Sequence, residues 1–312
     1  MNINRISLLL LLPVFTCAGI SSAISERATS AMEVLKSTDV AARRQAAAEL
    51  AGLRSIETVP ALIEALEDED SGVRSSAAEA LGNLRDRRAV NPIIKLLKDD
   101  NRSVRISAVV ALGFIRDITA VEPIIKILQR DSEVGVRISA AQVLGVMGDQ
   151  KSVNPLINLL SDSNVRVRAQ AARSLGKLAA ESAAGPLIDV INNKKEDRRV
   201  MNYAIEALGE IKTAKTLKLL EQLIESDDKE IAVNAAISLG KLGEDSGLKV
   251  ALSAARSDDV NIRRQAIMAI SYIGVKNEEV VNVLKEAAKD SDARVRSRAE
   301  YAASSLAINL EE

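Results

Sequence analysis

The stretch VRISAVVALGFI, residues Val104 to Ile115, recurs with small changes along most of the chain. Similar stretches read VRSSAAEALGNL from Val73, VRISAAQVLGVM from Val136 and IAVNAAISLGKL from Ile231. The Gly of the Leu-Gly pair gives each copy a fixed reference position, the anchor. Six anchors are glycines, spaced by 31 to 33 residues: Gly82, Gly113, Gly145, Gly176, Gly209 and Gly240. A constant period of this length indicates a protein built from stacked repeats.

The same register continues beyond the glycines, with Ala51 before them and Ser271 and Ser304 after them. The motif therefore occurs nine times in the 312 residues. This length alone suggests about two globular domains, but the unbroken period favours one elongated array over residues 24–312.

Each copy predicts an amphipathic helix, because apolar residues recur at the three- and four-residue spacing of a buried helical stripe. A glycine inside a helix costs roughly 1 kcal/mol relative to alanine. Six glycines at one register therefore suggest that neighbouring helices approach closely at the anchors.

A shorter helix is expected before each anchor helix. Five copies carry a proline near its start: Pro60, Pro92, Pro123, Pro155 and Pro186. A proline in the first helical turn loses no hydrogen bond, because the first N–H groups have no partner inside the helix. No segment alternates apolar and polar residues as a strand does, so we expect an all-α fold.

A polar motif recurs in the turn before the anchor helix. An Asp lies six residues before an Arg in five copies: Asp68 and Arg74, Asp99 and Arg105, Asp131 and Arg137, Asp162 and Arg168, Asp290 and Arg296. Each Arg can bridge to the Asp of its own repeat or to that of the next. Because the charges are matched, we interpret the motif as a structural ladder of ion pairs; the alternative is a basic stripe for an anionic partner.

The paired short helices, the proline, the Asp–x5–Arg turn and the Ala-rich Leu-Gly helix resemble HEAT repeats. The 31-residue length is similar to the short bacterial type first described in phycobilisome lyase subunits. The resemblance covers about residues 25–310. It implies an α-solenoid, a right-handed superhelix of about nine two-helix repeats whose second helices line the concave face.

Two repeats depart from this pattern. In the sixth, Lys195 and Met201 stand where Asp and Arg are expected, and in the seventh Ser226 and Ala232 do. We therefore expect the ladder to be interrupted at these two repeats. The sixth repeat also carries a longer segment, NNKKEDRRV from Asn192 to Val200, which is either a solvated loop or a contact site for an acidic partner.

The composition argues against several classes of function. The 42 basic residues are balanced by 43 acidic ones, whereas nucleic-acid binders usually carry a basic excess. The chain has no His, the commonest metal ligand and general base. No catalytic, cofactor or metal site is therefore predicted. Because HEAT arrays are mostly interaction scaffolds, we expect a non-enzymatic scaffold for a protein or peptide; the alternative is an enzyme subunit of the bilin-lyase-like class.

The resemblance also suggests where a partner would bind. The exposed stripe of each second helix should pass through the positions seven and three before the anchor and one after it. In the third and fourth repeats this stripe is apolar, and we predict a partner site of Ile106, Val110, Phe114, Ile138, Gln142 and Val146. A charged middle, with Arg173 and Glu206, separates it from a second, mixed patch of Val233, Ile237, Met268 and Tyr272. The alternative is that tight curvature buries these side chains between repeats.

Residues 1–23 lie outside the repeats and are typical of a signal peptide. One positive charge, Arg5, precedes an apolar run from Ile6 to Ile20, and Ser21-Ser22-Ala23 supplies the small residues of a cleavage site. We expect cleavage after Ala23 and export to the periplasm or cell envelope, or secretion. The run is short for a membrane span of ~20 residues. Association with a membrane is expected only if Cys17, the single cysteine, is lipidated, and the bulky Phe15 argues against that.

Overall fold

A computed structural model describes residues 17–310 of the chain, with side chains from residue 25 onward. These residues form 18 α-helices joined by short turns, and none of them lies in a strand. The helices make nine consecutive pairs, which confirms the expected all-α architecture of repeated helix pairs. None of the described helices is both long and apolar enough to cross a membrane. Of the predicted signal peptide, residues 1–16 lie outside the described residues.

The chain divides into two compact units after Ile115. Unit 1 contains three helix pairs: α1 Cys17–Val34, α2 Val40–Leu53, α3 Val59–Ala65, α4 Ser71–Leu84, α5 Val90–Leu96 and α6 Arg102–Ile115. Unit 2 contains six: α7 Val121–Arg130, α8 Val134–Met147, α9 Val153–Asn158, α10 Val165–Leu178, α11 Ala184–Asn192, α12 Arg198–Leu208, α13 Ala214–Leu223, α14 Lys229–Lys241, α15 Leu248–Ala254, α16 Val260–Ile273, α17 Glu278–Ala287 and α18 Ala293–Ser305.

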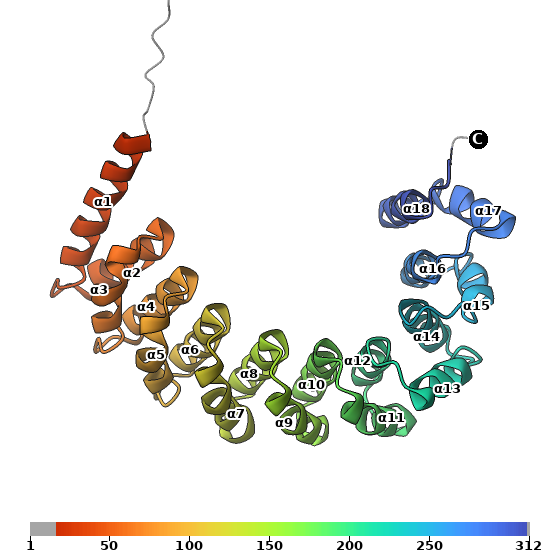
Figure 1. The fold of residues 1–312 in the computed structure, drawn as a ribbon, viewed down its shortest axis with the longest axis horizontal. Helices are drawn as coiled ribbons and strands as arrows, with labels where there is room; N and C mark the ends of the chain where they lie inside the picture. Colours follow the sequence, from red (N-terminus) through yellow and green to blue (C-terminus); the bar gives the residue numbers. More distant parts are fainter. Residues whose placement is uncertain (1–16, 311–312) are drawn as a thin grey trace, which may run out of the picture. The chain divides into compact units, whose positions relative to one another are not determined.

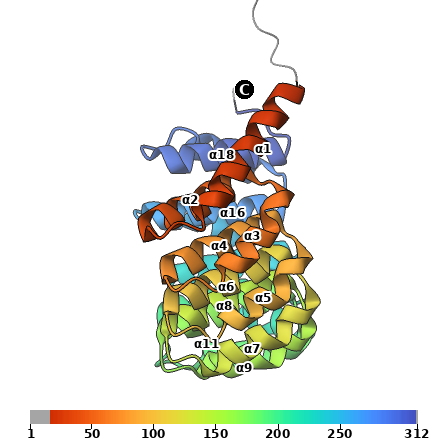
Figure 2. The same ribbon diagram turned by 90° about the vertical axis from the view of Figure 1, so that its left-hand side faces the viewer.

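Within each unit the helices form two rows. Unit 2 curves, and its even-numbered helices lie on the inside of the curve with the odd-numbered ones outside (Figure 1). In unit 1, α2, α4 and α6 follow one another, with α3 and α5 beside them (Figure 2). The core lies between the rows, where Leu81, Leu144 and Leu175 are fully buried. The even-numbered helices of unit 2 are called the inner row below.

The expected prolines lie in the first turns of the short helices. Pro60 is the second residue of α3, and Pro92 and Pro155 are the third residues of α5 and α9. Most of the longer second helices begin at a capping side chain. Asp70, for example, accepts hydrogen bonds from the backbone N–H groups of Gly72 and Val73 at 2.9 and 3.0 Å. These caps satisfy donors that the helix itself leaves free.

The anchor glycines lie where successive second helices meet. A Cβ added to Gly82 would lie 2.7 Å from the Cα of Ala111 on the next second helix. At Gly176 it would lie 2.8 Å from the Cα of Ala207. Both distances are far shorter than a van der Waals contact, so a glycine is required at these positions. The close approach inferred from the sequence is confirmed.

Four of these close approaches, at Gly82, Gly145, Gly176 and Gly209, have a second small residue two positions before the next anchor, whereas Gly240 meets the backbone of Ile273. Ala111 and Ala207 hold this position, and so do Ser174 and Ser238. The two serines are buried, and each donates a hydrogen bond of 2.8 Å to a backbone carbonyl of the preceding second helix. The glycine and this small residue together form a seam along which the helices touch almost backbone to backbone.

The seam predicts opposite effects for two Gly→Ala substitutions. Gly145→Ala should destabilise the protein by about 1–3 kcal/mol, the usual cost of overpacking, because the new Cβ would lie 2.7 Å from the Cβ of Ser174. Gly185→Ala in α11 is the control, since nothing lies within 4 Å of its added Cβ. It should leave stability unchanged or raise it by up to about 1 kcal/mol. If denaturant unfolding showed the same loss in free energy of unfolding for both variants, the close contact at the seam would be contradicted.

Candidate functional site

The arginines of the turn motif bridge neighbouring repeats. Arg74 donates from Nη1 to the backbone carbonyls of Asp68 and Glu69 in its own turn, at 2.8 and 2.9 Å. Its Nε and Nη2 donate to the two carboxylate oxygens of Asp99 in the next repeat, at 2.7 and 3.0 Å. The sequence left open whether each Arg bridges to the Asp of its own repeat or to that of the next. Arg74 does both: it binds the backbone carbonyl of the Asp in its own repeat and the side-chain carboxylate of the Asp in the next repeat.

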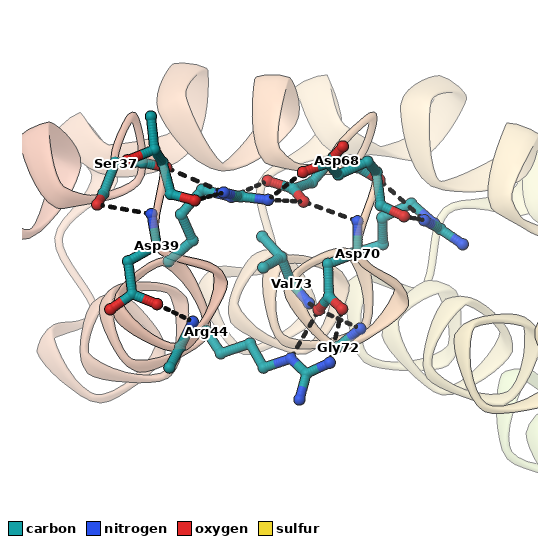
Figure 3. Close-up of polar contacts among 12 residues, drawn as sticks. Ser37, Asp39, Arg44, Asp68, Asp70, Gly72 and Val73 are labelled. Atoms are coloured by element: carbon teal, nitrogen blue, oxygen red, sulfur yellow. Dashed lines mark hydrogen bonds and ion pairs between the residues drawn. The ribbon is translucent and has the colours of Figure 1, made fainter.

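The same arrangement recurs in both units. Bidentate bonds to the next Asp, all between 2.7 and 3.1 Å, are made by the pairs Arg43–Asp68, Arg137–Asp162 and Arg263–Asp290. Bonds to the carbonyl of the Asp in the same turn, at 2.8 to 3.0 Å, are made by Arg105 to Asp99, Arg137 to Asp131, Arg168 to Asp162 and Arg296 to Asp290. Figure 3 shows this ladder around Asp68 and the neighbouring cap at Asp70, which Arg44 also contacts.

The predicted interruption of the ion-pair ladder at Lys195 is wrong, because Arg168 of the preceding repeat still binds a carboxylate there. Arg168 binds Glu196, the residue after Lys195, with Nη2 at 2.7 Å from Oε1. The longer segment of this repeat brings the longer Glu side chain to the place of the missing Asp. At Met201 and Ala232 there is no arginine to continue the ladder. The exposed Arg198 instead contacts Asp228 and Glu230 of the seventh repeat.

Burial and charge matching support a structural role for this ladder. The side chains of Arg74 and Asp99 are 17% and 8% exposed. Burial is the largest single influence and would raise the pKa of the Asp99 carboxyl. The hydrogen bonds from Arg74 and the Asn101 N–H, together with the charges of Arg74 and Arg105, hold this pKa below its ordinary value. Hydrogen bonds from Arg263 likewise lower the pKa of Asp290. Because these charges are satisfied within the fold, little of the ladder is left for an anionic partner.

The predicted apolar patch is in part exposed. On α6 of unit 1, Phe114 is 46% exposed while Ile106 and Val110 are half-buried. On α8 of unit 2, Val146 is 39% exposed, Gln142 is exposed and Ile138 is half-buried. The expected exposure is therefore found for Phe114, Gln142 and Val146 and not for the other three residues.

The second predicted patch needs a correction. Val233 and Ile237 on α14 are 0% and 5% exposed, and they belong to the core cluster that contains Ile267 of α16. Because α14 and α16 pack closely, these positions face the contact between helices. Met268 is half-buried, whereas Tyr272 is 48% exposed. The alternative interpretation, that these side chains are buried between repeats, is therefore correct for Val233 and Ile237.

Hollows lie along the inner row of unit 2. Two of them include Glu206, and one includes Arg173, residues of the charged middle that was expected only to separate the two predicted patches. A central hollow of about 360 Å³ is bounded by α12, α14 and α16. A second, of about 320 Å³, lies between α10 and α12 and shares Tyr203 and Glu206 with the first. The central hollow is lined by Arg199, Asn202, Tyr203, Glu206, Asn234, Ile237, Ser238, Lys241, Gln265, Met268 and Tyr272. A third lies between α16 and α18.

All three tyrosines of the chain line these hollows: Tyr203, Tyr272 and Tyr301. A cation lies over two of the rings. The Cζ of Arg173 is 5.7 Å from the ring centroid of Tyr203, and the Nζ of Lys241 is 5.6 Å from that of Tyr272. Such contacts hold the rings in place on the surface. Tyrosine is enriched at binding sites because it offers a large apolar area together with a hydroxyl group.

Two buried amide oxygens of the central hollow have no hydrogen-bond donor within reach among the described residues: Asn202 Oδ1 and Gln265 Oε1. The orientation of Asn202 is fixed, because its Nδ2 donates to Glu230 Oε1 at 2.8 Å. A buried acceptor without a partner costs about 1–3 kcal/mol. Such acceptors are suited to receive the N–H group of a ligand after small side-chain movements.

Several residues of the hollows are not among those predicted from the sequence. Tyr203, Asn234 and Gln265 all lie six residues before their anchors, whereas the predicted stripe used the seventh and third positions. The rarity of aromatic residues, 2% of the chain, was a usable signal for the tyrosines. Among the described residues, no group of three or more Cys, Asp or Glu side chains is arranged to hold a metal ion.

Comparisons with known proteins agree with this architecture. A family model for HEAT repeats matches residues 29–113, 77–131, 121–202 and 217–304. No curated protein is significantly similar in sequence.

Similar solved structures include the YibA protein of Escherichia coli, 18% identical, with a TM-score of 0.53 over 88% of this chain and 98% of its own. An engineered protein is 23% identical, with a TM-score of 0.49 over 90% of this chain and 89% of its own. The complex of CpcE and CpcF of phycocyanin lyase from Nostoc sp. PCC7120 is 25% identical, with a TM-score of 0.46 over 79% of this chain and 93% of that chain.

The lowered pKa of Asp99 predicts a pH-dependent effect of Asp99→Asn. The ion pair with Arg74 contributes stability that is full above the unfolded-state pKa of about 3.9 and is lost as the pH falls through the lower folded-state pKa. The variant should melt at a lower temperature than the wild type at pH 7, and the difference should shrink below about pH 4. Asp100→Asn, at an exposed neighbour, is the control and should have little effect. A difference that stays constant down to pH 2.5, measured by circular dichroism, would contradict this role of the charge.

Proposed function

This chain belongs to the HEAT-repeat family, and we propose that it acts as a non-enzymatic scaffold that binds a protein or peptide along the inner row of unit 2. The observation that carries the proposal is the placement of every tyrosine of the chain on α12, α16 and α18, beside the hollows between these helices. Aromatic side chains dominate the binding energy of many interfaces. In a chain with so few aromatic residues, the concentration of all three tyrosines on one row of helices favours partner binding there.

The shape and polarity of this surface suit an extended peptide. The hollows follow one another over successive helices, so they favour a chain that crosses several repeats. The unpaired oxygens of Asn202 and Gln265 are acceptors for backbone N–H groups of such a chain. The non-enzymatic part of the proposal is supported by the lack of His, and by carboxylates that serve in ion pairs and helix caps.

We also propose that the protein is exported and works in the periplasm or cell envelope. The support is the signal-like composition of residues 1–23. Cleavage after Ala23 would leave Ala28 and Ala31, two buried residues of α1, in the mature protein. Mass spectrometry of the native protein should therefore find Ile24 as the first residue. Retention of Met1, or a lipid on Cys17, would refute this proposal.

The binding proposal predicts which substitutions abolish partner capture. Immobilised protein should retain a partner from the native envelope fraction, and the double variant Tyr203→Ala, Tyr272→Ala should lose it. Single hot-spot truncations cost about 2 kcal/mol or more, roughly thirtyfold in affinity. The matched control is Ile118→Ser, which removes a side chain that is 65% exposed away from the inner row. Equal capture by both variants would contradict the site, and a bound bilin chromophore would favour the lyase-like alternative.

A further inference from the structure

The hollow between α16 and α18 is strongly basic. It has a volume of about 520 Å³ and is lined by Arg264, Arg294, Arg298 and Tyr301 among its six residues. Arg294 is already engaged, because its Nη2 lies 3.0 Å from the carboxylate of Asp292, the cap of α18. The side chains of Arg264 and Arg298 make no ion pair or hydrogen bond with any described residue. This hollow therefore holds two uncompensated positive charges.

Unlike the arginines that bridge two repeats of the ladder, Arg264 and Arg298 have no carboxylate partner within the described part of the chain. Arg263, next to Arg264 in the chain, donates two hydrogen bonds to Asp290, at 2.7 and 2.9 Å. Arg264 and Arg298 are half-buried on the inner row, which lowers the screening of their charges by water. Tyr301, 64% exposed, adds an apolar surface and a hydroxyl group beside them. Two like charges around one hollow repel each other, and an anion placed between them would remove that repulsion.

We propose that this hollow recognises carboxylate side chains of the bound partner, so that the ligand of the inner row is an extended peptide with an acidic end. This inference rests on the proposed function and adds the chemistry of the partner to it. Guanidinium groups suit the task because their planar donors match the two oxygens of a carboxylate.

The charges elsewhere on the inner row favour a peptide over a nucleic acid. Glu206, in the central hollow, has no basic partner among the described residues. The other carboxylate nearby, Glu210, is paired with Lys241 at 2.8 Å. A phosphodiester backbone would bring negative charge close to Glu206, whereas a peptide can place a neutral or basic residue there. The overall balance of 42 basic and 43 acidic residues also lacks the excess that nucleic-acid binding requires.

The spacing of the helices sets the length of the peptide. From α12, which carries Glu206, to α18, which carries Arg298, there are three helix steps. At about 8–10 Å per step this is roughly 24–30 Å, which about seven to nine residues of extended chain span at ~3.3 Å each. The partner segment should therefore carry acidic residues seven to nine positions away from the residue that meets Glu206.

The experiment is an array of ten-residue peptides in which each sequence appears in matched Glu, Gln and Lys versions. The full-length wild-type protein should prefer the Glu versions by roughly tenfold or more, the effect of a hydrogen bond to a charged group. The double variant Arg264→Gln, Arg298→Gln should lose the preference. Arg298→Lys keeps the charge and should retain part of it. Arg130→Gln, at the exposed end of α7, removes a positive charge elsewhere and should change nothing.

The outcomes separate this inference from the proposed function. If peptides bind without a preference for Glu, or if the double variant keeps the preference while folded, the acidic specificity is wrong but the scaffold stands. If no peptide binds to any of the variants or to the wild type, both are wrong. Tighter binding of a single-stranded oligonucleotide than of any peptide, with loss in the double variant, would overturn the inference in favour of nucleic acid.

Discussion

The close approach of successive second helices, at an anchor glycine and a small residue of the next helix, is the contact on which the rest of the structure depends. Where Gly82, Gly145, Gly176 and Gly209 meet an Ala or Ser, no large side chain fills the seam, so the surface beside it can be hollowed. Gly176 and Ala207 line the hollow between α10 and α12, and Ser238 lines the central one. The contact between successive second helices therefore lies beside the hollows in which we propose that a partner binds. Larger residues at the flanking positions, such as Tyr203 and Tyr272, form the walls.

The turn arginines fix the repeats at a second place. Arg74, for example, binds the carbonyl of Asp68 in its own turn and the carboxylate of Asp99 in the next repeat, so these turns are held together by directional bonds. Removing one partner of a buried pair leaves the other charge uncompensated, so each pair favours one arrangement of neighbouring turns. Adjacent arginines differ in their contacts: Arg263 holds Asp290, whereas Arg264 lines the hollow between α16 and α18, where we propose that it binds a carboxylate.

Much of the fold could be predicted because repetition multiplies weak signals. One glycine in a helix says little, but six at one register indicated the seam correctly. Where repeats differ, predictions based on a residue's position relative to the anchor were wrong, for physical reasons. Glu196 replaces the Asp missing at Lys195 because a longer side chain on a longer segment reaches the same arginine. Val233 and Ile237 are buried because α14 packs closely against α16, which no residue spacing reveals. Tyr203 was missed because hollows form between helices, so their linings include positions beside the exposed stripe.

The central claim is that a partner binds along the inner row of unit 2, and the chain offers a direct probe of it. It has no Trp, and its three tyrosines all lie on α12, α16 and α18, so its intrinsic emission reports on this face. A partner peptide without Tyr or Trp should be titrated into the protein while tyrosine emission and the anisotropy of a dye on the peptide are followed together. The account predicts a saturable change in tyrosine emission with the same midpoint as the anisotropy. Saturable binding by anisotropy with unchanged tyrosine emission would contradict it.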